Sequence, residues 1–380
     1  MNPSSLQAFS GNARIPALEG LRGFAFLMVH FFHTKLFGPA LGDHPLSRSL
    51  GFFGEMGWAG VDLFFVLSGF LITGILLRQV DSPGWVGRFY LRRTVRIFPI
   101  YFVVLVGTVW VLPLVIGWTL EYAQTPRSNF LWYATFLHNW LNWGVNGWPK
   151  GDPLIGHLWS LGVEEQFYLV WPAIVALVGI RRLPLVAIAL LLSAPLIRMV
   201  MIGSGFTYDA VYALTICRAD ALAAGGLIAV LKEKASLPSP KAAWIMVAAG
   251  ASLFTVTPIV TSYFEHPTQD QLKAAAFSWG LLQWCGILLL ALGSGPIARI
   301  LSWRPLRLVG FYSYSLYLVS YPITMVTGVY WKDLIGRWST WGLIGFYLSS
   351  LALSAGIAWV SWHLIEKRLL NLIGKAPEFR

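Results

Sequence analysis

Long apolar runs constrain this chain more than any other feature of its sequence. About 20 consecutive apolar residues are enough for a helix to cross the hydrocarbon core of a bilayer, and a helix satisfies its backbone hydrogen bonds internally. Ten such runs occur, at about 18–37, 58–78, 98–118, 157–179, 184–202, 210–231, 242–262, 273–293, 309–331 and 340–364. They predict an all-α, polytopic membrane protein with about ten transmembrane helices.

The composition agrees with this prediction. Only 12% of the 380 residues are charged and 56% are hydrophobic, whereas about 25% charged residues are typical of soluble domains. Of the 28 Lys and Arg residues, 18 lie on one side of the expected helices and seven on the other. Basic residues favour the cytoplasmic side, so we expect both termini to be cytoplasmic and the protein to be a multi-pass protein of the inner (plasma) membrane. This bias accounts for the net charge of +11 without a nucleic-acid partner.

The expected spans divide the chain simply. Residues 1–14 form a cytoplasmic segment, residues 15–370 a single transmembrane domain, and residues 371–380 a cytoplasmic tail. The first run has no basic segment before it and no cleavage site after it, so we expect a retained helix. The external stretch at about 119–156 is predicted to be interfacial or re-entrant, and its tryptophans suit either interfacial anchoring or stacking on sugars; they are Trp132, Trp140, Trp143 and Trp148.

Ionisable side chains at membrane depth are the candidate functional residues, because each is costly unless it is paired or faces a bundle interior. The candidates are Arg22, His30 and His33 in the first run, His157, Glu164 and Glu165 in the fourth, and Arg198, Arg218 and Asp220 in the fifth and sixth. Helical periodicity brings Arg22 and His33 to one face of their helix, and His157 and Glu164 to one face of theirs.

Imidazole beside carboxylate is typical of general-base catalysis on an alcohol. The alternative is that these side chains only form hydrogen bonds between neighbouring helices, and for His30 we favour that alternative. The two cysteines, Cys217 and Cys285, lie in apolar runs and are expected to act as small hydrophobic residues. The ligand spacing of a metal site is not present, so no metal is expected.

A basic segment follows the second run. Arg92, Arg93 and Arg96 lie within five residues and are flanked by Tyr90 and Tyr101. Arginine binds phosphate oxygens through two parallel hydrogen bonds, so the segment suits an anionic nucleotide cofactor. The alternative is a charge anchor that only sets the topology. No phosphate-binding glycine motif is present, so neither ATP hydrolysis nor dinucleotide chemistry is supported.

Five segments resemble the membrane-bound acyltransferase family 3, a family of integral-membrane O-acyltransferases. They are Ile15–His33, Gly60–Ile72, Phe89–Tyr101, His157–Tyr168 and Tyr312–Tyr317. Arg22 and His33 match the family's signature of Arg, ten residues and His. Arg93 and Arg96 match its paired arginines, and the segment from Trp159 to Tyr168 matches its Trp-Ser-Leu-x-Val-Glu-Glu-Gln-Phe-Tyr motif.

The resemblance implies that an acyl group, commonly acetyl, moves from cytoplasmic acyl-CoA to a hydroxyl of a carbohydrate. On that basis we expect acyl-CoA as a co-substrate bound by Arg92, Arg93 and Arg96, with no permanently bound cofactor. His33, Arg22, Glu164 and Glu165 are then the catalytic candidates. Residues with possible supporting roles are His157, Arg198, Arg218, Asp220 and Ser68.

Two alternatives are open from the sequence. A transporter or flippase would also place charged residues inside a helical bundle, although no inverted repeat is visible. The acceptor is equally open, because a fold does not determine a substrate, and a small natural product such as a macrolide is an alternative to a glycan.

Overall fold

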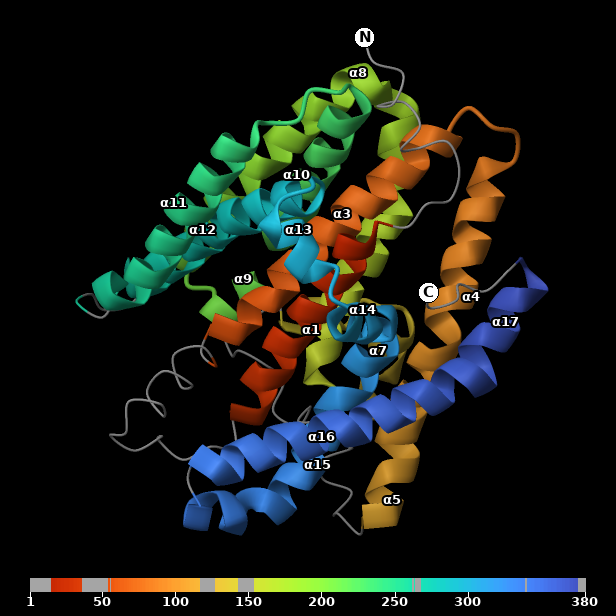
Figure 1. Cartoon of the computed structure of the whole chain (residues 1–380), viewed down its shortest axis with the longest axis vertical. Coiled ribbons are helices and arrows are strands. Elements are labelled where there is room, and N and C mark those ends of the chain that lie inside the picture. Colours follow the sequence, from red (N-terminus) through yellow and green to blue (C-terminus); the bar gives the residue numbers. More distant parts are fainter. Residues whose placement is uncertain are drawn as a thin grey trace.

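The computed structural model describes residues 15–35, 54, 56–116, 127–142, 154–261, 263, 268–338 and 340–374. Almost all of these residues are helical, and no strand occurs among them, so the all-α prediction is confirmed for this part of the chain (Figure 1). The longer helices are α1 (Pro16–Lys35), α3 (Gly60–Gln79), α4 (Trp85–Val106), α8 (Trp159–Gly203), α10 (Thr215–Glu233), α11 (Pro240–Thr261), α12 (Thr268–Ala291), α15 (Ser313–Trp338) and α16 (Thr340–Ser361).

Shorter helices connect or extend these elements. The α-helices among them are α5 (Leu112–Ile116), α7 (Phe130–Ala134), α9 (Tyr208–Ala213), α13 (Pro296–Leu301), α14 (Arg304–Phe311) and α17 (Lys367–Leu372). The 3-10 helices are η2 (Gly57–Ala59), η4 (His138–Asn142) and η5 (Gly156–Leu158), and the π-helices are η3 (Gly107–Val111) and η6 (Trp362–Glu366). The π-helix η3 continues α4 into α5, and η6 continues α16 into α17, so each of these pairs is one long helix (Figure 1).

Among the described residues, six helical stretches are long and apolar enough to cross a membrane. They are Gly57–Gln79, Trp85–Val115, Gly156–Gly203, Tyr208–Glu233, Thr268–Ala291 and Trp341–Leu372. The chain is therefore a multi-pass membrane protein, but the expected count of ten is not confirmed. Helices α1, α11 and α15 fall in expected spans and are outside this set. Helices α1 and α15 carry polar side chains of the site described below, which lower their hydropathy.

The expected spans at 157–179 and 184–202 form one helical stretch that is interrupted at a single residue. Gly179 has φ 64° and ψ 171°, and two helical segments of α8 meet there (Figure 1). That conformation is accessible almost only to glycine, because a Cβ atom would collide with the backbone. A bend therefore occurs where the sequence placed a loop, just before Arg181 and Arg182.

Glycines allow two pairs of helices to approach closely. Helices α3 and α10 cross where a Cβ atom on Gly69 would overlap the Leu222 carbonyl oxygen and one on Gly225 would overlap that of Val66. Helices α1 and α14 cross in the same way, where a Cβ on Gly310 would overlap the Glu19 carbonyl oxygen. Small residues at helix crossings are typical of membrane bundles, where close backbone packing replaces the hydrophobic effect.

The segment 127–142, which contains α7 and η4, is anchored to the bundle by polar contacts. Gln166 of α8 donates to the Phe136 carbonyl oxygen at 2.7 Å and accepts from the Trp140 indole at 2.8 Å. Asn139 accepts from Gln166 at 2.8 Å and donates to Thr215 at 2.9 Å. The segment is therefore packed against α8 and the start of α10 and does not form a further helix pair.

Candidate active site

A cavity of about 240 Å³ lies between α1, α3, α4, α8 and α15. Its polar lining consists of Arg22, Ser68, Arg93, Arg96, Ser160, Glu164, Tyr168, Ser313, Tyr314 and Tyr317. Its apolar lining comes mainly from α3, which contributes Val61, Phe64, Phe65, Leu67, Leu71, Ile72 and Ile75, and is completed by Ile97 and Leu161. The cavity is thus lined by residues from all five segments that carry the family resemblance.

Three arginines make this cavity cationic. The Nε atom of Arg22 donates to the Ser313 hydroxyl at 3.2 Å, which links α1 to α15. The Arg93 guanidinium lies over the rings of Phe89 and Tyr168, at 5.9 and 5.3 Å from their centroids. Arg96, one helical turn further along α4, completes the group. The arrangement favours an anionic ligand, since the arginines outnumber the carboxylate in the lining.

Arg92 is placed differently from the two arginines with which the sequence grouped it. Its side chain is exposed and does not belong to the cavity lining. The residues that share the cavity are Arg93 and Arg96, at i and i+3, rather than Arg92 and Arg96 at i and i+4. Both spacings bring side chains to neighbouring positions on a helix, so the sequence alone does not distinguish between them.

The carboxylate in the cavity wall is that of Glu164. It accepts a hydrogen bond from the Ser68 hydroxyl of α3, and the Ser68 and Tyr168 hydroxyls lie 2.9 Å apart. These three side chains form a connected path of exchangeable protons beside the arginines. Glu165 is not part of the cavity lining, and its Oε1 atom is buried with no hydrogen-bond partner among the described residues.

His33 lies beyond one end of the cavity and not in its wall. Its ring packs against Tyr321 with a centroid distance of 4.5 Å and lies 6.5 Å from the ring of His157. The ring of His157 lies 4.8 Å from that of Tyr321, and its Nε2 atom donates to the Leu318 carbonyl oxygen at 3.2 Å. The structure therefore separates the expected pair: Glu164 lines the cavity, while His157 joins His33 and Tyr321 in a second group, the histidine cluster.

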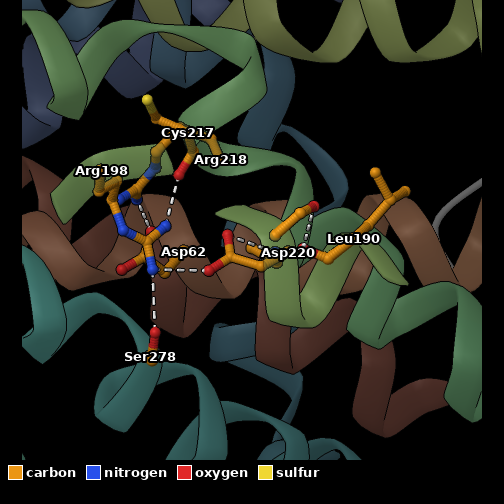
Figure 2. A network of polar contacts seen from close by, with 9 residues as sticks. Asp62, Leu190, Arg198, Cys217, Arg218, Asp220 and Ser278 are labelled. Atoms are coloured by element: carbon orange, nitrogen blue, oxygen red, sulfur yellow. Dashed lines mark hydrogen bonds and ion pairs between the residues drawn. The ribbon is translucent and has the colours of Figure 1, made fainter. Parts of the chain in front are cut away.

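The remaining charged candidates do not line the cavity and form a buried ion-pair network. Figure 2 shows this network. Arg198 of α8 pairs with Asp220 of α10 at 2.9 Å, and its guanidinium also donates to the Cys217 carbonyl oxygen at 2.5 Å and to the Ser278 hydroxyl at 2.9 Å. Arg218 pairs with Asp62 of α3. The four charges cancel, so the network links α3, α8, α10 and α12 as a neutral group.

Arg218 is further enclosed by aromatic rings. Its guanidinium lies 4.4 Å from the ring centroid of Phe277 and 5.2 Å from that of Tyr212. The rings of Phe65 and Trp159 also lie within cation–π range, at 5.7 and 5.9 Å. An ion pair and four aromatic rings thus surround the Arg218 guanidinium.

Sequence reasoning missed several residues of the site. Tyr168, Tyr317 and Ser160 line the cavity, and Asp62 partners Arg218. Glu366 was also missed: it is buried in η6 and accepts hydrogen bonds from Ser315 at 2.5 Å and Ser361 at 3.0 Å. All except Glu366 and Ser361 fall inside the five family-like segments, so the only signal was their presence there.

The structure describes two of the four external tryptophans. The Trp140 indole donates to Gln166, while Trp132 is 42% exposed; Trp143 and Trp148 lie outside the described residues.

In the described part of the chain, no group of three or more His, Cys, Asp or Glu side chains is placed to hold a metal ion. The cavity therefore presents arginines, a carboxylate and hydroxyls as its chemical groups.

Known proteins related to this chain are O-acetyltransferases by name. Relatives include OatA of Listeria monocytogenes, named a peptidoglycan O-acetyltransferase, which is 29% identical over 334 residues covering 82% of this chain and 50% of the relative. The O-acetyltransferase OatA of Staphylococcus aureus is 29% identical over 373 residues, covering 93% of this chain and 56% of the relative. YrhL of Bacillus subtilis is 29% identical over 377 residues, covering 93% of this chain and 54% of the relative.

The chain thus spans about half the length of the curated relatives it matches. No solved structure matches it. The model of the acyltransferase domain family matches residues 15–363, which include every segment that forms the cavity and the histidine cluster. This match confirms the family resemblance seen in the sequence, and the chain belongs to the acyltransferase domain family.

Proposed function

We propose that this protein is a membrane O-acetyltransferase that moves an acetyl group from acetyl-CoA, on the cytoplasmic side of the plasma membrane, to a hydroxyl of a glycan. In this reaction the acceptor oxygen forms a bond to the acetyl carbon, the carbon–sulfur bond of the thioester breaks, and coenzyme A leaves as the thiol. The proton lost by the acceptor hydroxyl balances the one gained by the sulfur.

The cationic cavity is the observation that carries this proposal. Three guanidinium groups, those of Arg22, Arg93 and Arg96, face a space of about 240 Å³. Phosphate groups and the developing negative charge of a thioester addition are the anions such a group stabilises. The apolar lining from α3 suits the uncharged arm that joins the phosphates of coenzyme A to its sulfur.

Proton transfer is assigned to the hydroxyl and carboxylate groups beside the arginines and to the histidine cluster. Glu164, Ser68 and Tyr168 are within hydrogen-bonding distance of one another, so protons can be exchanged along them. His33 either deprotonates the acceptor hydroxyl or carries the acetyl group as acyl-imidazole. Both roles use a neutral imidazole nitrogen, and Nδ1 of His33 has no hydrogen-bond partner among the described residues.

The relatives indicate the class of acceptor. One of them is named a peptidoglycan O-acetyltransferase, and both OatA proteins carry O-acetyltransferase in their names. A glycan of the cell surface is therefore the first acceptor to test, and a small natural product with a free hydroxyl is the second.

The test is release of free coenzyme A from acetyl-CoA by the detergent-purified protein, with and without a glycan extract of the host. We expect release to require the extract, to fall about 100-fold or more in His33→Ala and Glu164→Gln, and to persist in His363→Ala, a histidine outside the site. Release that is independent of His33 and Glu164 would contradict the assigned roles. Folded wild-type protein that releases no coenzyme A with any glycan would contradict the proposed donor.

A further inference from the structure

A pair of hydroxyl groups separates the cavity from the histidine cluster. Ser160 and Tyr317 both line the cavity, and their hydroxyl oxygens lie 2.6 Å apart. Both hydroxyl oxygens also lie within hydrogen-bonding distance of the backbone carbonyl oxygen of His157, that of Ser160 at 3.2 Å and that of Tyr317 at 3.0 Å. These contacts hold the two side chains against each other and against the backbone of His157.

The histidine cluster adjoins this pair through the contact between His157 and Tyr317. The ring centroids of His157 and Tyr317 lie 5.4 Å apart, and Tyr321 contacts both His157 and His33. His33 is 9% exposed and His157 4% exposed, and Nδ1 of each ring has no hydrogen-bond partner in the described part of the chain. His157 therefore lies next to a residue of the cavity wall, and His33 lies next to His157 and Tyr321.

One face of α15 connects the two sites. Ser313, Tyr317 and Tyr321 follow one another at intervals of four residues, which places them on the same side of the helix. Ser313 contacts Arg22 at one end of this face, Tyr317 contacts Ser160 in the middle, and Tyr321 contacts His33 at the other end. Tyr317 is therefore the residue of this face at which the cavity and the histidine cluster meet.

We propose that Tyr317 is the partition between the cavity and the histidine cluster, and that displacement of its side chain joins them into one continuous passage. This inference rests on the proposed function only in naming the cavity as the donor site. Its physical basis is that Tyr317 is held by hydrogen bonds between neutral groups rather than by an ion pair. Such contacts can be broken and remade during turnover, as the motions that gate many active sites require.

The test measures access to the histidines and does not depend on turnover. The purified full-length protein is treated with diethyl pyrocarbonate, which modifies neutral imidazole nitrogens, and the modification rate of each histidine is followed by peptide mass spectrometry. We expect Tyr317→Ala to raise the rates at His33 and His157 about fivefold or more, and Tyr317→Phe to raise them about twofold, since it keeps the ring and loses the hydroxyl.

The matched control is Tyr314→Ala. Tyr314 also belongs to α15 and lines the cavity, but its hydroxyl donates to the Ile97 carbonyl oxygen at 2.7 Å, which lies on α4. This change enlarges the cavity without opening the partition, so the rates at His33 and His157 should stay at the wild-type value. His30 and His138, both buried outside the cavity lining, report misfolding, because unfolding would raise their rates too.

Equal rates at His33 and His157 in wild type and Tyr317→Ala, or an equal rise in Tyr314→Ala, would overturn the proposal. The coenzyme A release assay addresses a separate question. A rise limited to Tyr317 variants in a protein that releases no coenzyme A would support the partition and refute the proposed donor.

Discussion

Arg93 is held in the cavity wall by contacts that orient its charge. Its guanidinium lies over the rings of Phe89 and Tyr168, so its direction is set before a ligand arrives. Arg93→Gln should raise the KM for acetyl-CoA about tenfold and change kcat by less than about threefold, because a charge-assisted hydrogen bond contributes about 1.5–3 kcal/mol to binding. Steady-state kinetics over a range of acetyl-CoA concentrations measure both parameters.

The matched control for this prediction is Arg88→Gln on the same helix. Arg88 is exposed and donates to the Ser82 hydroxyl at 2.7 Å, outside the cavity. Arg88→Gln should leave the KM for acetyl-CoA within about twofold of the wild-type value, as is typical of exposed charges. An equal rise in both variants would mean that the general positive charge of α4, and not the cavity, attracts the donor.

Asp62 neutralises Arg218 in the interior of the bundle. Their side chains are 3% and 1% exposed, so Asp62→Asn would leave a buried guanidinium without its ion-pair partner. We expect a loss of about 3–5 kcal/mol in the free energy of unfolding, observed as a lower thermal midpoint in detergent. Glu233→Gln, which breaks the exposed pair with Arg78 at 3.3 Å, should cost less than about 1 kcal/mol.

A double variant distinguishes the effect of an unpaired Arg218 charge from other effects of replacing Asp62. In Asp62→Leu/Arg218→Met both charges are absent, and the midpoint should recover most of the way to the wild-type value, because apolar replacements of buried ion pairs are often neutral. A double variant as unstable as Asp62→Asn would show that the pair contributes by more than charge neutralisation.

At the scale of single residues, the sequence identifies which ionisable side chains are costly at membrane depth, but not which of them lie in contact in the fold. Arg22 and Glu164 were singled out by membrane depth, and both line the cavity. Arg198 and Arg218 satisfied the same criterion and instead pair with Asp220 and Asp62. Depth measures the cost of an ionisable group, and a partner on another helix can offset that cost as well as a substrate can.

The crossing of α3 and α10 is the helix contact that depends most on glycine. Gly225→Ala would drive a methyl group into the Val66 carbonyl oxygen, so the two helices would have to move apart. We expect a lower thermal midpoint and a loss of acetyl transfer, because α3 carries Ser68 and much of the cavity wall. Gly356→Ala on α16 is the control, since nothing lies within 4 Å of its added Cβ, and it should unfold like wild type.

The segment 127–142 has a titratable group at its anchor. The ring of His138 stacks on Tyr133 at a centroid distance of 4.6 Å, and burial lowers the pKa of His138 from 6.5 to about 4. Folding therefore favours the neutral ring: its contribution is complete above pH 6.5 and is lost as the pH falls from 6.5 towards 4. We expect this segment to become sensitive to protease over that range.

His138→Phe supplies the matched test of this pH dependence. Phenylalanine can stack on Tyr133 and does not titrate, so protease sensitivity between pH 6.5 and 4 should be much weaker in this variant. Limited proteolysis at several pH values, with a protease active throughout the range, measures the difference. The same pH dependence in both proteins would assign it to other groups.

At the scale of elements, the apolar pattern predicts helices well and their ends poorly. Run lengths identified helical residues at 157–179 and 184–202, yet Gly179 alone interrupts α8 between Trp159 and Gly203. The pairing of α3 with α10 was also invisible, because a glycine at a crossing looks the same as a glycine in a lipid-facing helix. Packing between helices distant in sequence decides both features.

For the whole molecule, composition was sufficient to place the chain in a membrane, whereas the cavity required the three-dimensional arrangement. The residues that line it come from positions as far apart as Arg22 and Tyr317. The placement of His33 outside the cavity that Glu164 lines arises at this scale too, because it depends on how α1, α8 and α15 are placed against one another. No pattern within a single helix contains that information.

The orientation of the whole molecule in the bilayer is predicted by the distribution of its basic residues. Basic residues concentrate on one side of the expected spans, which is also the side expected to hold both termini, and this bias predicts that it faces the cytoplasm. Cys217 and Cys285 are buried, so Cys217→Ala/Cys285→Ala is a suitable background for single-cysteine labelling. Ser236, between α10 and α11, should then lie inside the cell, and Ser128, in the segment 127–142, should lie outside.

A membrane-impermeant maleimide applied to intact cells distinguishes the two sides. We expect it to label Ser128→Cys directly and Ser236→Cys only after permeabilisation. The reverse pattern would turn the arginines of the cavity towards the outside, where no acetyl-CoA is available, and would refute the cytoplasmic donor. Labelling of both positions in intact cells would place them on the same side and contradict the expected succession of spans between them.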